Sequence, residues 1–178
     1  MRTALLVIDL QIALTDMGHR AKEVLACVSG LIRRARAAGV PVIHVQHHHA
    51  SWAPLKAGAP TWKIHPDVAP APGEVVIGKT ASDAFHETAL QAELEQCGVK
   101  RLVVTGMQTE YCVDTTCRRA ISLGYDVTLV ADGHTTRDGL MPASEIIRHH
   151  NAVLPGLAHP HHHVTVVPGH DVRFESRP

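Results

Sequence analysis

Hydrophobic residues follow two spacings along the chain, one typical of helices and one typical of buried strands. From Ala21 to Ala38 they recur every three or four residues, which places them on one face of a helix. Gly39 follows, and glycine commonly closes a helix in the left-handed conformation. The mostly apolar segment Val40–Val45 comes next. This order predicts a helix packed on a sheet, followed by a strand of that sheet.

The same order of helix, glycine and strand occurs twice more. Apolar positions that end at Gly98 and at Gly124 precede the predicted strands Arg101–Thr105 and Tyr125–Val130. The remaining predicted elements are the strands Thr3–Ile8, Val75–Ile77 and Val164–Val167 and a helix over about Ala143–Leu154. Near-continuous apolar strands that alternate with helices are typical of sheets covered on both faces. The pattern therefore predicts one α/β domain over residues 1–178, a three-layer α/β/α fold with a mainly parallel, doubly wound six-stranded sheet.

Residues 47–73 depart from this pattern. They are rich in Pro, Gly and Ala, and they hold both tryptophans of the chain, Trp52 and Trp62. A long irregular excursion within a compact domain is usually functional, so we predict that it forms a pocket wall. A loose surface loop is the alternative, which two large aromatic side chains disfavour.

Composition and charge exclude several classes of function. The 178 residues include 17 Lys and Arg against 17 Asp and Glu, so the formal net charge is zero, and aromatic residues make up 3%. These values do not indicate a basic surface for nucleic acid or anionic membranes, nor a platform for stacking bases. The apolar run Ala4–Ile8 ends at Asp9 and is too short for a signal peptide or a membrane span. We predict a soluble cytoplasmic protein without nucleic-acid or membrane partners.

Residues Gly73–Thr80 match the pattern G-x-x-x-x-G-K-[ST] of phosphate-binding loops. The four residues between the glycines are strand formers, however, and Pro70 and Pro72 precede the match, whereas the true motif follows a strand and opens a helix. We therefore interpret Lys79 as a lysine at the carboxyl end of a strand and not as part of a nucleotide site.

Asp9, Lys79 and Cys112 each come after a predicted strand. Ligands of open parallel sheets bind outside the carboxyl ends of the strands, so these three side chains are candidates for one site. Each alone has an ordinary structural explanation. Asp9 would cap a helix, Lys79 would be a solvated surface charge, and Cys112 would be a small core residue.

Cys112 differs in its setting from the other cysteines of the chain. Thr109 is placed to cap the helix after Arg101–Thr105, which would put Cys112 in its first turn. The helix dipole and a neighbouring lysine favour a thiolate there, so we expect a lowered pKa and preferential alkylation of Cys112. The cysteines interpreted as reduced packing residues are Cys27, Cys97 and Cys117.

Three blocks of sequence carry a family resemblance. The first is Leu5–Gln11, the second runs from Lys79 through Ala84–Phe85 to Thr88–Leu90, and the third is Thr105–Val113, with the spacing Gly-x-x-Thr-x-x-Cys-Val. Together they resemble the isochorismatase-like cysteine hydrolases, from about Leu5 to His150. That family includes nicotinamidases, N-carbamoylsarcosine amidohydrolase, streptothricin hydrolase and isochorismatases proper, and the resemblance implies a parallel six-stranded sheet.

The resemblance also implies roles. Cys112 would be the nucleophile, Asp9 the general base that activates it, and Lys79 the partner that keeps Asp9 ionised. The Met107–Gln108 peptide would be cis, and the backbone N–H groups of Gln108 and Cys112 would form an oxyanion hole. Isochorismatases proper lack the cysteine, so Cys112 favours cleavage of a C–N bond in a small amide or lactam through a thioester. The implied assembly is a homo-oligomer, a dimer or a tetramer. Two alternatives stay open: a nicotinamidase-like, metal-assisted amidase and a catalytically idle relative that binds a metabolite.

The metal ligands of nicotinamidases are not all present. Those enzymes hold the ion with an Asp and two His after the second strand, whereas here His47 stands at the Asp position, His49 is kept, and Pro54 or Leu55 replaces the other His. The run from His47 to His49 still offers imidazole ligands, but adjacent strand residues point to opposite faces, which disfavours their convergence on one ion. We expect no metal and no cofactor. The residues predicted to line the substrate pocket are Trp52, Trp62, Phe85 and Tyr111.

Overall fold

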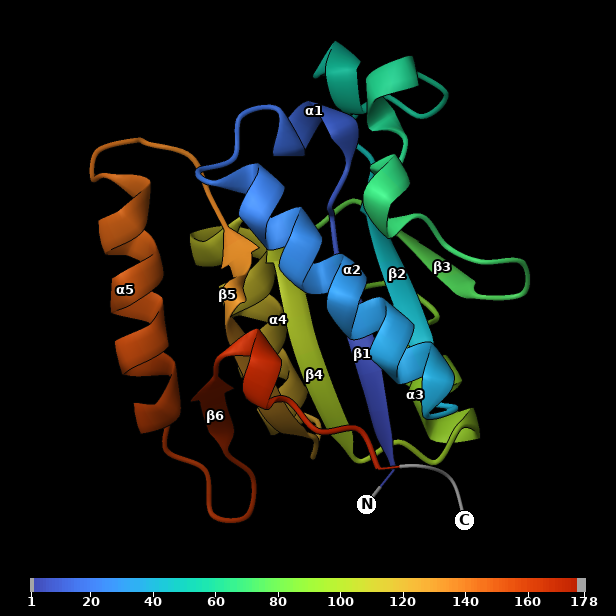
Figure 1. Ribbon diagram of the computed structural model, residues 1–178, viewed down its shortest axis with the longest axis vertical. Coiled ribbons are helices and arrows are strands. Elements are labelled where there is room, and N and C mark those ends of the chain that lie inside the picture. The colour runs from blue at the N-terminus through green and yellow to red at the C-terminus, as the bar shows by residue number, and fades with distance from the viewer. Residues whose placement is uncertain (1, 176–178) are drawn as a thin grey trace.

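Six parallel strands form one sheet in the order β3-β2-β1-β4-β5-β6 (Figure 1). The computed structural model describes residues 2–175. The strands are β1 (Thr3–Ile8), β2 (Val42–His47), β3 (Val75–Lys79), β4 (Arg101–Met107), β5 (Asp126–Thr135) and β6 (Val164–Val167). The predicted fold class is therefore confirmed. β5 extends five residues beyond the predicted end at Val130, through a register shift against β4.

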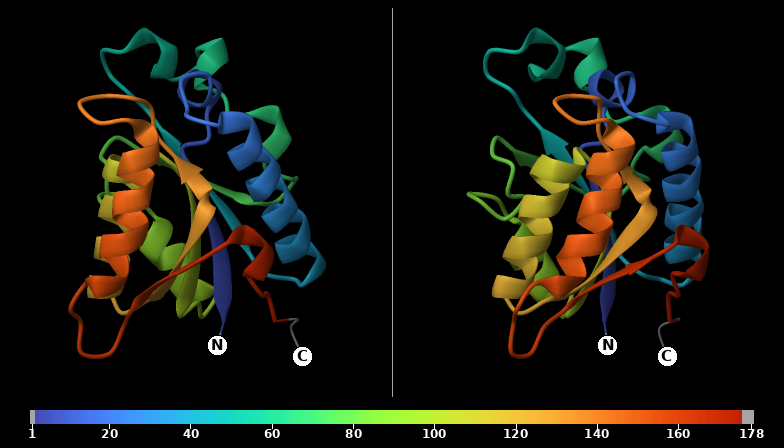
Figure 2. Two further views of the ribbon diagram at one scale, coloured as in Figure 1. Left: turned by 60° about the vertical axis from the view of Figure 1, so that its left-hand side comes forward. Right: turned by 90° about the vertical axis from the view of Figure 1, so that its left-hand side faces the viewer.

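Helices cover both faces of this sheet (Figure 2). They are α1 (Ile12–Thr15), α2 (Ala21–Ala37), α3 (Leu90–Gln96), α4 (Asp114–Ser122) and α5 (Ala143–Val153). α2 packs on one face of the sheet over one hydrophobic cluster. α3 and α4 pack on the other face over a second cluster, which they share. β1 is buried on both sides, since Leu6 and Ile8 lie in one cluster and Leu5 and Val7 lie in the other. None of the helices within residues 2–175 is long and apolar enough to cross a membrane.

The excursion of residues 47–73 is packed against the body of the protein and is not a loose loop. It contains three short 3₁₀ turns, of which the first two lie beyond the carboxyl ends of the central strands and the third packs beside α2 (Figure 1). The side chain of Gln11 anchors it, because the amide group donates to the carbonyl oxygens of His47 (3.0 Å) and Trp62 (2.7 Å). Two of its own side chains, Leu55 and Val68, are buried against the body of the protein. These contacts make the excursion a fixed wall above the sheet.

β1 and β4 come unusually close at their carboxyl ends. Gly106 has φ +127°, and a Cβ atom at this position would overlap the carbonyl oxygen of Ile8. Only glycine combines this backbone conformation with so close an approach. Asp9 follows Ile8 directly and also has a positive φ, +51°. The two strands thus deliver Asp9 and the residues after Met107 to the same place.

Candidate active site

Asp9, Lys79 and Cys112 meet beyond the carboxyl ends of β1, β3 and β4. The ammonium group of Lys79 lies 2.7 Å from Oδ2 of Asp9 and 3.2 Å from Sγ of Cys112. Asp9 and Lys79 are buried, whereas Cys112 is partly exposed. The structure therefore brings together the three residues that the sequence analysis selected, with the lysine between the acid and the thiol.

The Lys79 ammonium has two further neighbours. It donates to the carbonyl oxygen of Ala81 at 2.9 Å, and it lies 3.1 Å from Nδ1 of His47. An ammonium group has three N–H bonds, so these four acceptors must share them. The contact with His47 was not predicted, because nothing in the sequence indicates that the last residue of β2 reaches the lysine of β3.

The same arrangement bears on metal binding. Within residues 2–175, ligand atoms of Asp9, His47 and Cys112 lie within 4.8 Å of one another, a spacing that suits a metal ion. The Lys79 ammonium, however, contacts all three of these side chains. A cation is thus already present among the donors, so the set does not fit a metal ion while Lys79 keeps its position.

Burial and charge set the protonation of the acid and the lysine. Burial raises the pKa of the Asp9 carboxyl above its usual value, although the Lys79 charge and hydrogen bonds from Lys79 and Cys112 act in the opposite direction. Burial alone would lower the pKa of Lys79, but the charges of Asp9 and Cys112 outweigh it, and the pKa is raised. Lys79 therefore stays an ammonium ion beside a carboxylate that accepts a proton more readily than an exposed aspartate.

The expected low pKa of Cys112 is wrong for the resting protein. Burial raises the pKa of its thiol to about 12, and the charge of Asp9 adds to this effect, while Lys79 only partly opposes it. Cys112 is therefore a neutral thiol at pH 7, and it needs a base to become a nucleophile. The other thiols are not all buried either, since Cys27 and Cys97 are half-buried. Preferential alkylation of Cys112 in the resting state no longer follows.

The turn that carries Cys112 also differs from the prediction. Thr109–Val113 is one turn of π-helix, which continues into α4. Thr109 does not cap a helix, because its hydroxyl group lies 2.9 Å from Nδ1 of His134 instead. The other ring nitrogen of His134 lies 2.9 Å from the side-chain oxygen of Asn151 in α5. A buried histidine of β5 thus connects the turn of Cys112 to α5.

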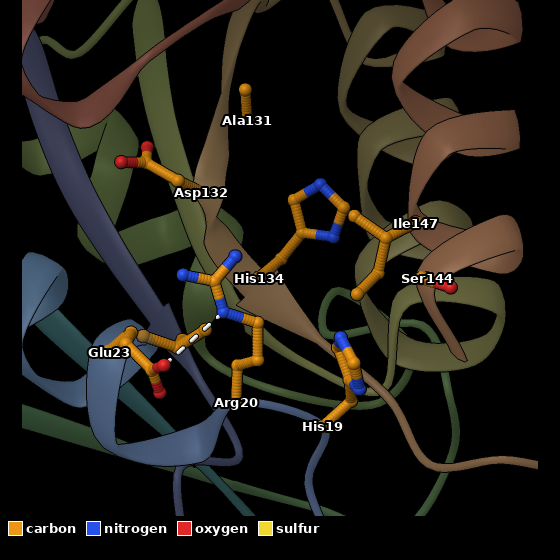
Figure 3. Close-up of a pocket in the computed structure, with 9 residues that line it drawn as sticks. His19, Arg20, Glu23, Ala131, Asp132, His134, Ser144 and Ile147 are labelled. Carbon is orange, nitrogen blue, oxygen red and sulfur yellow. Dashed lines mark hydrogen bonds and ion pairs between the residues drawn. The ribbon is translucent and has the colours of Figure 1, made fainter. Parts of the chain in front are cut away.

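His134 also lines a second cavity of about 300 Å³, which lies between α2, β5 and α5 (Figure 3). Arg20 and Glu23 on its α2 side form an ion pair at 3.3 Å. Asp132, another lining residue, accepts a hydrogen bond from the amide of Gly169. Cys112 does not line this cavity. Arg20, Glu23 and Asp132 are each paired with another group of the protein.

The peptide bond between Met107 and Gln108 is cis, the conformation that the family resemblance implied. The π-turn folds back onto Gln108, whose carbonyl oxygen accepts hydrogen bonds from the amides of Tyr111 (3.2 Å) and Val113 (3.1 Å). Amide groups of the first helical residues point out of the amino end of a helix. Cys112, the fourth of the five residues of this turn, stands in sequence between the two residues whose amides bond to Gln108.

A cavity of about 690 Å³ opens beside the thiol, a size typical of small-molecule sites. Its lining includes Asp9, Cys112 and Gln108 together with two of the predicted pocket residues, Trp52 and Tyr111. Lining residues that the sequence analysis did not assign to this pocket are Leu14, Met17, His47, His49, Leu55, Thr80, Ser82 and Arg137.

Two other predicted pocket residues lie elsewhere. Phe85 is buried in the core, and its ring stacks on that of Tyr125 with centroids 5.9 Å apart. The ring of Trp62 packs against His48, with centroids 5.2 Å apart. Phe85 thus stabilises the sheet–helix interface, and Trp62 fixes the excursion. Neither belongs to the lining of the cavity beside Cys112.

Fold and site together define a parallel α/β protein with a cysteine, a lysine and an aspartate at the carboxyl edge of its sheet. Residues 3–154 match the sequence profile of the Isochorismatase domain, and the chain belongs to this family. It is 41% identical over 138 residues to streptothricin hydrolase of Streptomyces noursei. The aligned residues make up 76% of this chain and 50% of that protein. The chain thus spans only about half the length of this relative.

Further relatives agree with this membership. Nicotinamidase 3 of Arabidopsis thaliana is 34% identical over 148 residues, covering 75% of this chain and 73% of that protein. The crystal structure of an isochorismatase from Pseudomonas putida KT2440 superposes with a TM-score of 0.86 at 30% identity, covering 97% of this chain and 90% of that one. The match to the family profile, over residues 3–154, includes strands β1 to β5 and the residues Asp9, Lys79 and Cys112.

Proposed function

We propose that this protein is a cysteine hydrolase that cleaves the C–N bond of a small amide or lactam through a thioester. One observation carries the proposal: the buried ammonium of Lys79 joins the Asp9 carboxylate to the Cys112 thiol beside a cavity of small-molecule size. Relatives named streptothricin hydrolase and nicotinamidase support a reaction of this class.

The first half of the reaction forms the thioester. Asp9 accepts the thiol proton, and the sulfur of Cys112 attacks the carbonyl carbon of the substrate. The negative charge that forms on the carbonyl oxygen would be held by the amides of Gln108 and Cys112. Asp9 then gives its proton to the leaving nitrogen, and the C–N bond breaks. Ammonia or an amine departs from an amide, whereas the ring of a lactam opens and the amine stays attached to the acyl group.

The second half releases the acid. Asp9, again a carboxylate, takes a proton from water, whose oxygen attacks the thioester carbonyl carbon. The C–S bond breaks, the carboxylic acid leaves, and the sulfur takes the proton back from Asp9. The raised pKa of Asp9 suits a group that must alternate between accepting and donating a proton.

The metal-assisted alternative has less support in this chain. In nicotinamidases the ion is held by residues of the excursion, but here the corresponding His47 faces the Lys79 ammonium through Nδ1. The idle alternative differs from our proposal in one measurable respect, since an idle relative would leave every amide intact.

Replacing Asp9 by Asn tests the proposal, because two measurements should change in opposite directions. Loss of the proton acceptor should lower the rate of ammonia release by about 100- to 10,000-fold. Loss of the same negative charge removes a cause of the raised pKa of Cys112, so alkylation of Cys112 by iodoacetamide at pH 7 should become faster, by about tenfold or more.

The assay uses a panel of small amides and lactams that includes nicotinamide and streptothricin, with release of ammonia or an amine, or opening of the lactam ring, as the readout. Peptide mapping after alkylation separates Cys112 from the other thiols. Asp16→Asn is the matched control, because Asp16 is an exposed carboxylate at the end of α1 and should change neither rate. No release from any amide by the unmodified protein, or a parallel fall of both rates in Asp9→Asn, would contradict the proposal.

A further inference from the structure

Two histidines that line the cavity beside Cys112 use the same ring nitrogen as a hydrogen-bond acceptor. Nδ1 of His49 faces the backbone amides of Trp52 (2.9 Å) and Ser51 (3.3 Å). Nδ1 of His47 faces the Lys79 ammonium at 3.1 Å. Amide and ammonium groups can only donate, so Nδ1 of each ring must offer its lone pair.

The ring proton of each neutral histidine is therefore on Nε2. Burial, aided by the Lys79 charge, lowers the pKa of His47 to about 4, so this ring is neutral at pH 7. Among the described residues, Nε2 of His47 and Nε2 of His49 have no hydrogen-bond partner, and the two residues are partly exposed and exposed, respectively. Both residues line the cavity, and Nδ1 of each ring is engaged elsewhere, so Nε2 is the ring nitrogen left for a molecule inside the cavity.

This tautomer conflicts with metal binding. A histidine that holds a metal presents the lone pair of one nitrogen to the ion, and its other nitrogen usually donates a proton to a carbonyl or carboxylate group. Here both rings have the reverse arrangement, because Nδ1 accepts and Nε2 carries the proton. His47 and His49 are thus built as hydrogen-bond donors, although they stand where nicotinamidases place metal ligands.

The rest of the lining shows which molecules would suit these donors. Arg137 also lines the cavity, and its guanidinium group has no charged partner among the described residues. The one carboxylate of the lining, Asp9, is paired with Lys79. The cavity therefore offers N–H donors and a positive charge but no free anion, a combination that favours molecules rich in acceptor atoms.

We infer that His47 and His49 are specificity-determining residues whose Nε2–H groups bind an acceptor atom of the substrate, remote from the scissile amide. The inference rests on the proposed function and narrows its substrate class to small amides that carry a second acceptor group, such as a carboxylate or a ring nitrogen. Simple amides without such a group leave both N–H groups unpaired and are poorer substrates.

The tautomer itself is testable without turnover. Nitrogen-15 NMR of the imidazole rings at pH 7 distinguishes the two neutral tautomers, and the variants His47→Phe and His49→Phe assign the two signals. Should either variant fail to fold, His47→Gln and His49→Gln serve instead. We expect protons on Nε2 of both rings. A proton on Nδ1 of either ring, or movement of these signals with added zinc, would overturn the inference.

Substrate preference provides the second measurement. Two pairs of amides differ chiefly by one acceptor: succinamate against butyramide for a carboxylate, and nicotinamide against benzamide for a ring nitrogen. In at least one pair, KM for the acceptor-bearing member should be lower. His49→Leu should reduce this preference by about threefold to tenfold through KM rather than kcat, since the lost hydrogen bond serves binding.

Matched variants show whether the substrate preference depends on the N–H donor of His49 or only on a side chain that fills the same space. His49→Gln keeps an N–H donor at about the same reach and should retain part of the preference. His48→Leu is the control, because His48 packs on Trp62 outside the cavity lining and should not alter the preference. Equal loss in His48→Leu and His49→Leu, or no preference in either pair, would overturn the inference.

Failure of this inference can be told apart from failure of the proposed function. If the protein hydrolyses no amide, the proposed function fails. The Nε2 signals are then followed during titration with the same four amides. Shifts caused only by the acceptor-bearing members would still support His47 and His49 as donors. Equal shifts with both members of each pair, or none, would refute their role.

Discussion

Replacing Lys79 by methionine removes one charge from a site where the opposite charge cannot reach water. Methionine keeps most of the length of the side chain, so the main loss is the ammonium group 2.7 Å from Oδ2 of Asp9. Burial already raises the pKa of Asp9, and the Lys79 charge is the largest influence that opposes it. Without the lysine, the pKa of Asp9 must therefore rise further.

The size of the change follows from the burial of the pair. An opposite charge at such a distance commonly lowers the pKa of a carboxyl by about 1–3 units, so its removal should raise the pKa of Asp9 by a similar amount. The base acts as a carboxylate, which means that activity disappears as the pH falls through its pKa. The acid limb of the pH profile of kcat/KM should accordingly move upward by about 1–3 pH units.

Stability gives an independent measure of the same pair. Breaking a buried ion pair by removing one partner usually costs about 3–5 kcal/mol. Asp9 of the variant escapes part of this cost at low pH, because it can become protonated. The loss of stability in Lys79→Met should therefore be larger at pH 8 than at pH 5, as measured by urea unfolding at both values.

The pH profile is measured by amine or ammonia release from whichever amide the protein cleaves best. Lys100→Met is the control, since Lys100 is exposed just before β4, at the end of the strand opposite the site. An acid limb that stays in place in Lys79→Met would show that Lys79 does not keep Asp9 ionised. The opposite pH trend in stability would refute the assignment of a charged, buried Asp9.

Three further results are expected. Dialysis against EDTA should leave both turnover and the unfolding midpoint unchanged, because Lys79 already occupies the centre of the candidate ligand set; activity lost to EDTA and restored by zinc would favour the metal-assisted alternative. Gly106→Ala should lower the free energy of unfolding by more than about 1 kcal/mol, because its positive φ and the overlap with Ile8 both oppose a Cβ atom. Gly139→Ala, at a position where a Cβ atom would have open space, should leave the free energy of unfolding nearly unchanged. The predicted homo-oligomer should appear in light scattering as two or four times the chain mass of 19.3 kDa, and a mass of one chain would contradict it.

Much of the fold could be predicted because its determinants are local. The bounds of β1 and β6 agree with the predicted strands, and α2 ends one residue before the predicted end at Ala38. β5 was predicted too short, because the apolar run ends at Val130 and Asp132 and Gly133 follow soon after. In the structure the strand continues through them, since a register shift against β4 accommodates the irregularity.

The candidate site was predictable only in part. Asp9, Lys79 and Cys112 could be found, because parallel strands bring their carboxyl ends to one edge. The protonation of Cys112 could not, since burial and the charge of Asp9 depend on packing that no local pattern records. The same holds for Thr109, whose hydroxyl contacts His134 across the fold, a distant partner that competes with a local helix cap.

The anchoring of the excursion by Gln11 has a consequence for redesign. Gln11 lies two residues after Asp9, and its side chain fixes both His47 and Trp62, near the beginning and the middle of the excursion. Residues 50–59 are held between these two fixed points and include the cavity-lining Trp52 and Leu55. This segment is therefore a natural unit for exchange between relatives: a transplanted loop that retains the two anchor points would change the shape of the cavity while the base stays in place.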